Sequence, residues 1–146
     1  MTQADFYILA GQQRYDRWLF ACRLAEQLQR KGRQVLLQVS NQQEAQELDQ
    51  LLWTFRDDAF VPHACLSAED APIDCGVSIG WQEDPHHHHD VLIVLADNLP
   101  PFFARFKRLV EVVIQEDQVL ASTRERYRFL KDRGYPLNNK DMRLKS

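Results

Sequence analysis

The chain has 146 residues, of which 45% are hydrophobic and 27% are charged, and its formal net charge is −3 at pH 7. These values are typical of one globular domain spanning residues 1–146, with about 137–146 as a C-terminal tail, and they exclude a disordered or collagen-like chain. No apolar run is long enough to cross a membrane, and the first residues lack the pattern of a signal peptide, so we expect a cytoplasmic protein.

Charge is distributed unevenly along the chain. Residues 1–118 carry 10 Lys and Arg against 18 Asp and Glu, whereas residues 119–146 carry 8 against 3. The acidic body argues against sequence-specific binding of nucleic acid. The basic C-terminal end, in contrast, suits an acidic or phosphate ligand.

The first part of the chain predicts a β-α-β-α order. Residues 5–9 read as a short buried strand, and the helix after it ends at Gly32; its core stripe consists of Trp18, Ala21, Cys22 and Ala25. Residues 34–39 are apolar on consecutive positions, as in a parallel sheet covered on both faces. The next helix begins with a capping box, formed either by Ser40 with Gln43 or by Asn41 with Glu44.

Trp53 stands out in this second helix. If residues 45–55 are helical, the apolar side chains form one stripe and Trp53 points about 150° away from its centre, on the polar face. Alternatively, the helix ends near Leu52 and Trp53 folds back into the core; the spacing leaves both open. Phe60, Val61 and Pro62 follow a turn, and Pro62 excludes a central sheet position for that segment. With Trp53 exposed, these residues predict an apolar surface patch.

The second half continues the alternation. We expect a loop over residues 63–76, a short strand over 77–81, and a buried, central strand over 90–95. The chain then continues with a helix starting at Pro100 or Pro101 and running through Leu109, a strand over 111–114 and a last helix over 117–133, with Gly134 as its C-terminal signal. The fold class is therefore α/β, a three-layer sandwich with a mainly parallel central sheet.

Motifs for catalysis and for cofactors are missing from the sequence. The five glycines form neither G-x-G-x-x-G nor a P-loop, and there is no G-x-S-x-G elbow. The fold is thus Rossmann-like without a nucleotide-binding loop, and we expect no enzyme activity, no cofactor and no small-molecule substrate. The three cysteines lack C-x-x-C spacing and predict neither disulfides nor a zinc site.

Four consecutive histidines, His86, His87, His88 and His89, lie among acidic residues. Adjacent positions cannot easily place four imidazoles around one ion, because structural zinc sites take ligands from separate segments. We therefore expect opportunistic metal binding at most and assign this loop no function.

The last helix is basic and aromatic. Leu120, Thr123, Tyr127 and Leu130 share one face, and Arg124, Arg128 and Lys131 lie beside it. The like charges of Arg124 and Arg128, four residues apart, cost an isolated helix about 0.2–0.5 kcal/mol, which an acidic ligand would turn into attraction. An ordinary basic surface helix is the alternative. Guanidinium groups beside an apolar pocket suit a peptide that carries carboxylates and a bulky apolar end.

Short motifs are spread over nearly the whole length of the chain: Phe-Tyr at 6–7, Asp-Val-Leu-Ile at 90–93, Glu-Asp at 116–117, Gly134 and Leu-Asn at 137–138. The most specific ones are Leu-Trp at 52–53, Phe-Val-Pro-His at 60–63 and Arg-Glu-Arg-Tyr at 124–127. In these motifs the chain resembles the chi subunit family of the bacterial DNA polymerase III holoenzyme.

The resemblance implies a non-catalytic replisome subunit with two partners. One is the psi subunit of the clamp loader, bound through Trp53, Phe60, Val61 and Pro62. The other is the acidic C-terminal tail of single-stranded-DNA-binding protein, which ends in Pro-Phe and binds through Val113, Arg124 and Tyr127, with Arg128. Leu120 stands where the family resemblance suggests a basic residue, so the charge there would be weaker or would be supplied by Arg128 or Lys131.

Two other functions follow from the residues alone. The first is an α/β enzyme or binding protein for a nucleotide or phosphate ligand, against which the missing glycine loops argue. The second is metal storage or sensing through the histidines, which would require tight, stoichiometric binding of zinc.

Overall fold

The computed structural model describes residues 2–55, 63–65, 76–81 and 89–143. These residues form β1 (Gln3–Ile8), α1 (Arg14–Arg30), β2 (Val35–Gln38), α2 (Gln42–Thr54), β3 (His63–Cys65), β4 (Val77–Gly80), β5 (Val91–Val94), the 3-10 helix η1 (Phe103–Arg105), β6 (Arg108–Val113), α3 (Asp117–Asp132) and β7 (Leu137–Asp141).

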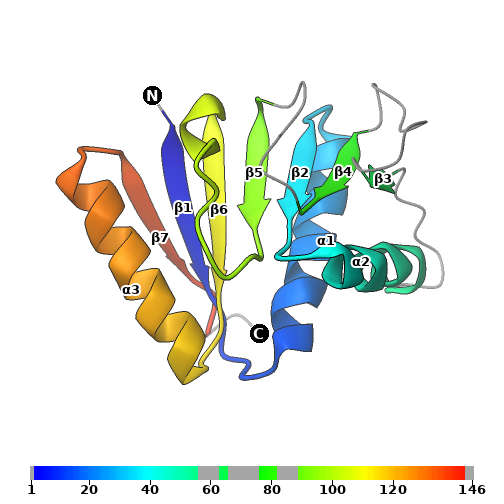
Figure 1. Ribbon diagram of the computed structural model, residues 1–146, viewed down its shortest axis with the longest axis horizontal. Coiled ribbons are helices and arrows are strands. Elements are labelled where there is room, and N and C mark those ends of the chain that lie inside the picture. The colour runs from blue at the N-terminus through cyan, green and yellow to red at the C-terminus, as the bar shows by residue number, and fades with distance from the viewer. Residues whose placement is uncertain (1, 56–62, 66–75, 82–88, 144–146) are drawn as a thin grey trace.

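The strands form one sheet with the order β3-β4-β2-β5-β6-β1-β7, and every neighbouring pair is parallel. Helices α1 and α2 pack on one face of the sheet and α3 on the other, which makes three layers (Figure 1). The predicted α/β sandwich with a parallel sheet is confirmed. So is the prediction that residues 90–95 form a central strand, because β5 is the middle strand of the sheet.

Each face of the sheet carries its own hydrophobic core, because alternate residues of a strand point to opposite faces. The core under α1 and α2 takes Val35 and Leu37 from β2 and contains the predicted stripe of α1 with Trp18 and Cys22. The core under α3 takes Leu36 from the same strand. Consecutive residues of β2 are therefore apolar because helices cover both faces of the sheet.

The helix ends follow the predicted signals. Gly32 and Gly134 have φ values of 79° and 81°, a left-handed conformation that favours glycine just after a helix. At the start of α2, the Asn41 side chain accepts a hydrogen bond from the Glu44 amide at 2.9 Å, which makes Asn41 the N-cap and gives the first half of the second predicted capping box; the reciprocal bond is shifted by one residue to Ser40. The Glu44 carboxylate in turn accepts from the Ser40 amide at 2.9 Å.

The predicted helix from Pro100 or Pro101 to Leu109 is wrong. Only η1 is helical in this stretch, and β6 begins at Arg108. A single 3-10 turn already buries Phe103 and Phe106, whose spacing of three suits that helix type. Leu109 then belongs to the strand alternation of β6, facing the α3 core, and not to a helical stripe.

Two segments predicted as loop or tail are strands. His63–Cys65 forms β3 within the predicted loop, and it lies at an edge of the sheet, as the position of Pro62 requires. Residues 137–141 of the predicted tail form β7, which pairs with β1 along its whole length. Neither segment has the apolar run of a central strand, since an edge strand needs less burial.

Trp53 lies inside α2, which continues to Thr54, so the alternative in which the helix ends near Leu52 is wrong. Leu48 and Leu52 are buried against the sheet, whereas the Trp53 side chain is 47% exposed. Trp53 therefore points away from the core, as the helical periodicity predicts.

Candidate functional site

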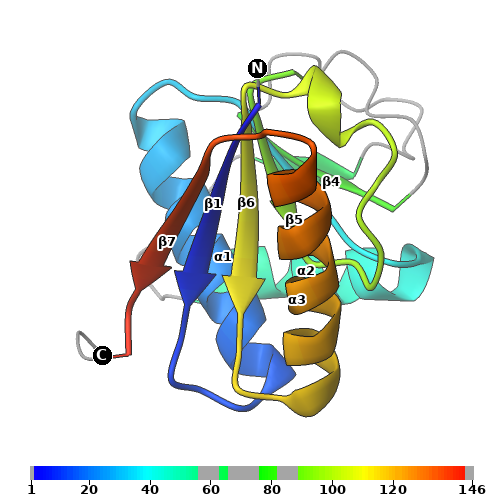
Figure 2. The same ribbon diagram turned by 90° about the vertical axis from the view of Figure 1, so that its left-hand side faces the viewer.

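A groove runs along α3 at the β7 edge of the sheet. Helix α3 runs antiparallel to the strands and packs near β6 (Figure 2). To one side of the helix, the sheet continues through β1 and β7. The space beside the helix is a groove of about 760 Å³, whose apolar side chains are Phe6, Ile8, Val113, Leu120 and Tyr127. The groove is therefore built by three strands and one helix that are distant in sequence.

The orientation of α3 is set by its buried side. The Glu116 side chain caps the helix by accepting from the amides of Gln118 and Val119, both at 3.1 Å. Leu130 is buried under the helix, and Arg126 points inward and donates to both oxygens of the buried Glu111, at 2.5 and 3.1 Å. With this side turned to the sheet, the adjacent flank of α3 borders the groove.

That flank carries three cations, Arg124, Arg128 and Lys131. All three are exposed, and within the described part of the chain none has a hydrogen bond or an ion pair with another side chain. Three cations close together on one helix repel one another. A ligand with carboxylates would remove this repulsion and form charge-assisted hydrogen bonds.

The far wall of the groove comes from β7 and the residues just after it. The Asn139 amide donates to the Tyr127 hydroxyl at 3.4 Å and so links the strand to α3. Arg143 adds a fourth cation to the lining. Neither residue could be placed here from the sequence, because the polar segment 137–141 shows no strand alternation that would indicate a strand beside the last helix.

All four residues predicted for tail binding line this one groove: Val113, Arg124, Tyr127 and Arg128. Leu120, which replaces an expected basic residue, also lines it and packs against the α3 core. Arg128 and Lys131 share the groove with it, as needed if they supply the missing charge. The structure brings these residues together; their binding role stays a prediction.

The residues predicted to bind psi are described only in part. Trp53 lies on the outer side of α2, where Gln46 and Gln50 are exposed too. Phe60, Val61 and Pro62 lie outside the described residues. Since α2 packs near β3 and β4 while the groove borders β1 and β7, Trp53 and the groove lie at opposite ends of the sheet (Figure 1).

The crevice at the carboxyl ends of the strands, where α/β proteins often bind nucleotides, contains three arginines that are already engaged. Arg14 forms an ion pair with Glu44, and Arg126 binds Glu111. Arg17 donates to three backbone carbonyls, at 2.8 Å to Val112, 3.3 Å to Leu95 and 3.4 Å to Val94. These bonds are structural, and they leave the crevice poorly suited to a phosphate.

His86, His87 and His88 lie outside the described residues, and His89 is exposed. Within the described ranges, no three potential metal-ligating side chains lie together, and none of the helices is both long and apolar enough to cross a bilayer.

The fold and the groove define a parallel α/β protein that carries a cation-lined apolar groove in place of a nucleotide-binding loop. The family model described as "DNA polymerase III chi subunit, HolC" matches residues 1–138. The chain belongs to this family, and with it to the accessory subunits of DNA replication.

Individual relatives agree over nearly the whole chain. The chain is 40% identical to the DNA polymerase III subunit chi of Pseudomonas aeruginosa over 139 residues, which cover 95% of this chain and 96% of the relative. It is 31% identical to the subunits chi of Haemophilus influenzae, covering 95% and 96% of the two chains, and of Escherichia coli, covering 94% and 97%. The resemblance inferred from the sequence motifs is thereby confirmed.

Proposed function

We propose that this chain is a non-catalytic subunit that bridges the clamp loader to single-stranded-DNA-binding protein. It binds the psi subunit through the Trp53 surface and the acidic C-terminal tail of single-stranded-DNA-binding protein through the groove beside α3. The observation that carries the proposal is the groove itself, in which an apolar floor is bordered by Arg124, Arg128 and Lys131, none of which is paired within the described residues.

The chemistry of the groove fits a peptide that ends in an aromatic residue and carries carboxylates upstream. Phe6, Ile8 and Tyr127 offer apolar contact for the aromatic ring. The cations would bind the carboxylates through charge-assisted hydrogen bonds, each worth about 1.5–3 kcal/mol. Because much of this attraction is between exposed charges, binding should weaken when salt is added.

The separation of the two surfaces supports the bridging role. Trp53 is 47% exposed on α2, and a Trp at an interface is often a residue that contributes most to affinity. The groove lies at the other end of the sheet, on the opposite face. Both partners can therefore bind at the same time without competing for space.

The test is a pair of single substitutions, each measured against both partners. We expect Trp53→Ala to weaken psi binding at least tenfold and to leave the tail interaction unchanged, since Trp anchors contribute about 2 kcal/mol or more. Arg124→Met should weaken binding of a tail peptide by about tenfold or more and leave psi binding unchanged. Isothermal titration with each partner, alone and in the presence of the other, measures both effects.

Matched controls exist on the same two helices. Gln46→Ala alters the exposed side of α2, and Arg133→Met removes a cation from the end of α3 outside the groove. Neither control should change affinity by more than about twofold. The two-surface proposal is overturned if Trp53→Ala and Arg124→Met each lose both partners while circular dichroism shows a folded chain.

A further inference from the structure

Arg143 differs from the other cations of the groove, because it is held by a neighbouring carboxylate. Its Nε donates to Asp141 Oδ1 at 2.9 Å and its Nη2 donates to Asp141 Oδ2 at 2.7 Å. The Arg143 amide donates to Oδ1 as well, at 3.0 Å. Asp141 thus binds Arg143 in the two-pronged geometry that a carboxylate of an acidic ligand would use.

The sheet holds this pair at the rim of the groove. Asp141 is the last residue of β7 and lies in register with Ile8, which lines the groove. The Met142 amide between the two partners donates to the Ile8 carbonyl at 2.8 Å. Both side chains are about half exposed, at 48% for Asp141 and 50% for Arg143, and Arg143 lines the groove, so a ligand there can compete with Asp141 for the guanidinium.

Asp141 is charged throughout the neutral range. The hydrogen bonds from the Arg143 side chain and amide lower the pKa of Asp141 to about 2. A permanent negative charge therefore lies beside a groove whose charged lining residues are four cations and Asp132.

We propose that Asp141 is an internal competitor for Arg143, which an acidic peptide must displace in order to bind. This inference rests on the proposed function of the groove. Exchanging one carboxylate for another at Arg143 changes the binding free energy little, so a ligand with a single carboxylate leaves the Asp141–Arg143 pair in place. A ligand with several carboxylates also engages Arg124, Arg128 and Lys131, and this attraction drives the exchange. Asp141 thereby makes the groove selective for strongly acidic peptides.

The test measures, by fluorescence anisotropy, the affinity of the chain for a peptide that has several acidic residues before Pro-Phe. Asp141→Asn keeps the shape of the side chain and releases Arg143 from the carboxylate, so affinity should rise about two- to fivefold, the range expected for an exposed ion pair. Asp132→Asn removes the same charge from the same groove but leaves the Asp141–Arg143 pair intact. Its effect should be clearly smaller.

The same substitutions made in the Arg143→Gln variant distinguish the release of Arg143 from the simple removal of a negative charge. In Arg143→Gln, the substitution Asp141→Asn should raise affinity no more than Asp132→Asn does, because there is no guanidinium to release. The proposal is overturned if Asp141→Asn and Asp132→Asn have equal effects, or if the effect of Asp141→Asn persists in Arg143→Gln. Failure of the unaltered chain to bind the peptide would instead refute the proposed function.

Discussion

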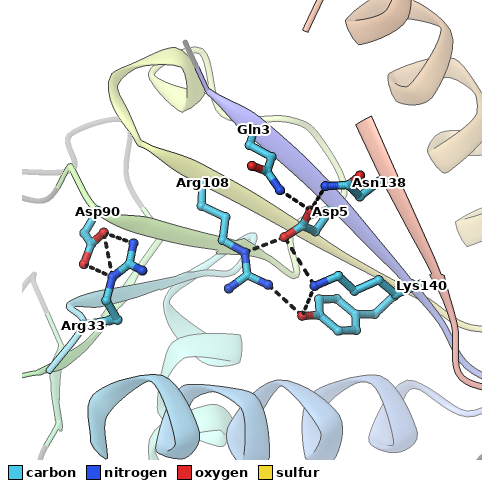
Figure 3. Close-up of polar contacts among 8 residues, drawn as sticks. Gln3, Asp5, Arg33, Asp90, Arg108, Asn138 and Lys140 are labelled. Atoms are coloured by element: carbon cyan, nitrogen blue, oxygen red, sulfur yellow. Dashed lines mark hydrogen bonds and ion pairs between the residues drawn. The ribbon is translucent and has the colours of Figure 1, made fainter. Parts of the chain in front are cut away.

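The two faces of β1 and β7 use the same kinds of side chain in opposite ways. On the face away from α3, Asp5 is 1% exposed and accepts hydrogen bonds from Arg108 at 2.5 Å, and from Gln3 and Asn138 at 3.2 Å (Figure 3). Lys140 Nζ lies 3.9 Å from the same carboxylate. Arg108 and Lys140 also donate to the Tyr7 hydroxyl, at 2.6 and 3.2 Å.

On the face toward α3, Arg124, Arg128 and Lys131 border an apolar floor and have no carboxylate partner among the described residues. The difference separates two roles of a cation. Where the chain supplies the partner, as at Asp5 and Glu111, the cation compensates a buried carboxylate, and losing the cation alone would destabilise the fold. Where the cation lies beside an apolar groove and the described residues offer it no carboxylate, it is available to a ligand.

The division between structural and ligand-binding cations can be tested by substitution, and the largest effect is expected at the buried pair of Arg126 and Glu111. Arg126→Met should lower the free energy of unfolding by about 3–5 kcal/mol, because it leaves the buried Glu111 carboxylate without a partner. Arg124→Met, two residues earlier on the same helix, should change stability by no more than about 0.5 kcal/mol. Urea denaturation of both variants measures this. Replacing the pair together, with Glu111→Leu and Arg126→Met, should restore most of the lost stability.

A smaller loss is expected on the face drawn in Figure 3. Arg108→Met removes the shortest hydrogen bond to Asp5 but leaves those from Gln3 and Asn138, so we expect a loss of about 1–3 kcal/mol in urea denaturation. Tail affinity should not change. Lys107→Met, an exposed neighbour, is the control. If Arg108→Met weakened binding of the tail peptide without destabilising the chain, the division between structural and ligand-binding cations would be wrong.

The smallest effect is the dependence of stability on pH. Burial by itself would raise the pKa of Asp5, but the hydrogen bonds from Arg108, Gln3 and Asn138 outweigh it and lower the pKa. The Arg33 guanidinium lowers the pKa of Asp90 in the same way. Because both folded-state pKa values lie below the ordinary 3.8, the two carboxylates stabilise the fold above that pH.

This contribution should therefore be lost as the pH falls from about 4 through the folded-state pKa values. Urea midpoints measured between pH 7 and pH 3 test it. In Asp5→Asn and Asp90→Asn, the fall at low pH should be shallower than in the unaltered chain. An unchanged pH profile in both variants would show that these ion pairs do not link protonation to folding.

Much of the fold was predictable because its signals are local. The stripe around Trp18 and Cys22, the apolar run of β2 and the glycines after α1 and α3 each act within one element, and each prediction is confirmed. The helix expected around Phe103 failed because its apolar spacing also fits a 3-10 turn followed by a strand. β7 was missed because an edge strand needs no apolar alternation.

The candidate site likewise has features that follow from local sequence and one that depends on a distant element. The face of α3 that carries Arg124, Tyr127 and Arg128 follows from helical periodicity, and the exposure of Trp53 follows from it once α2 is known to reach Thr54. That Arg126 points inward could not be read from the sequence, because the matching Glu111 lies on another element.

The helix faces, the buried strands and the family could be predicted from the sequence, because spacing and motif are properties of consecutive residues. Which cations are paired and where the groove lies depend on contacts between distant elements. Arg124 and Arg126 are equally basic in the sequence, and they differ because strand β6 places Glu111 beneath one of them. The groove exists because β7 adds a strand beyond β1, a pairing between residues more than 130 positions apart that no local pattern encodes.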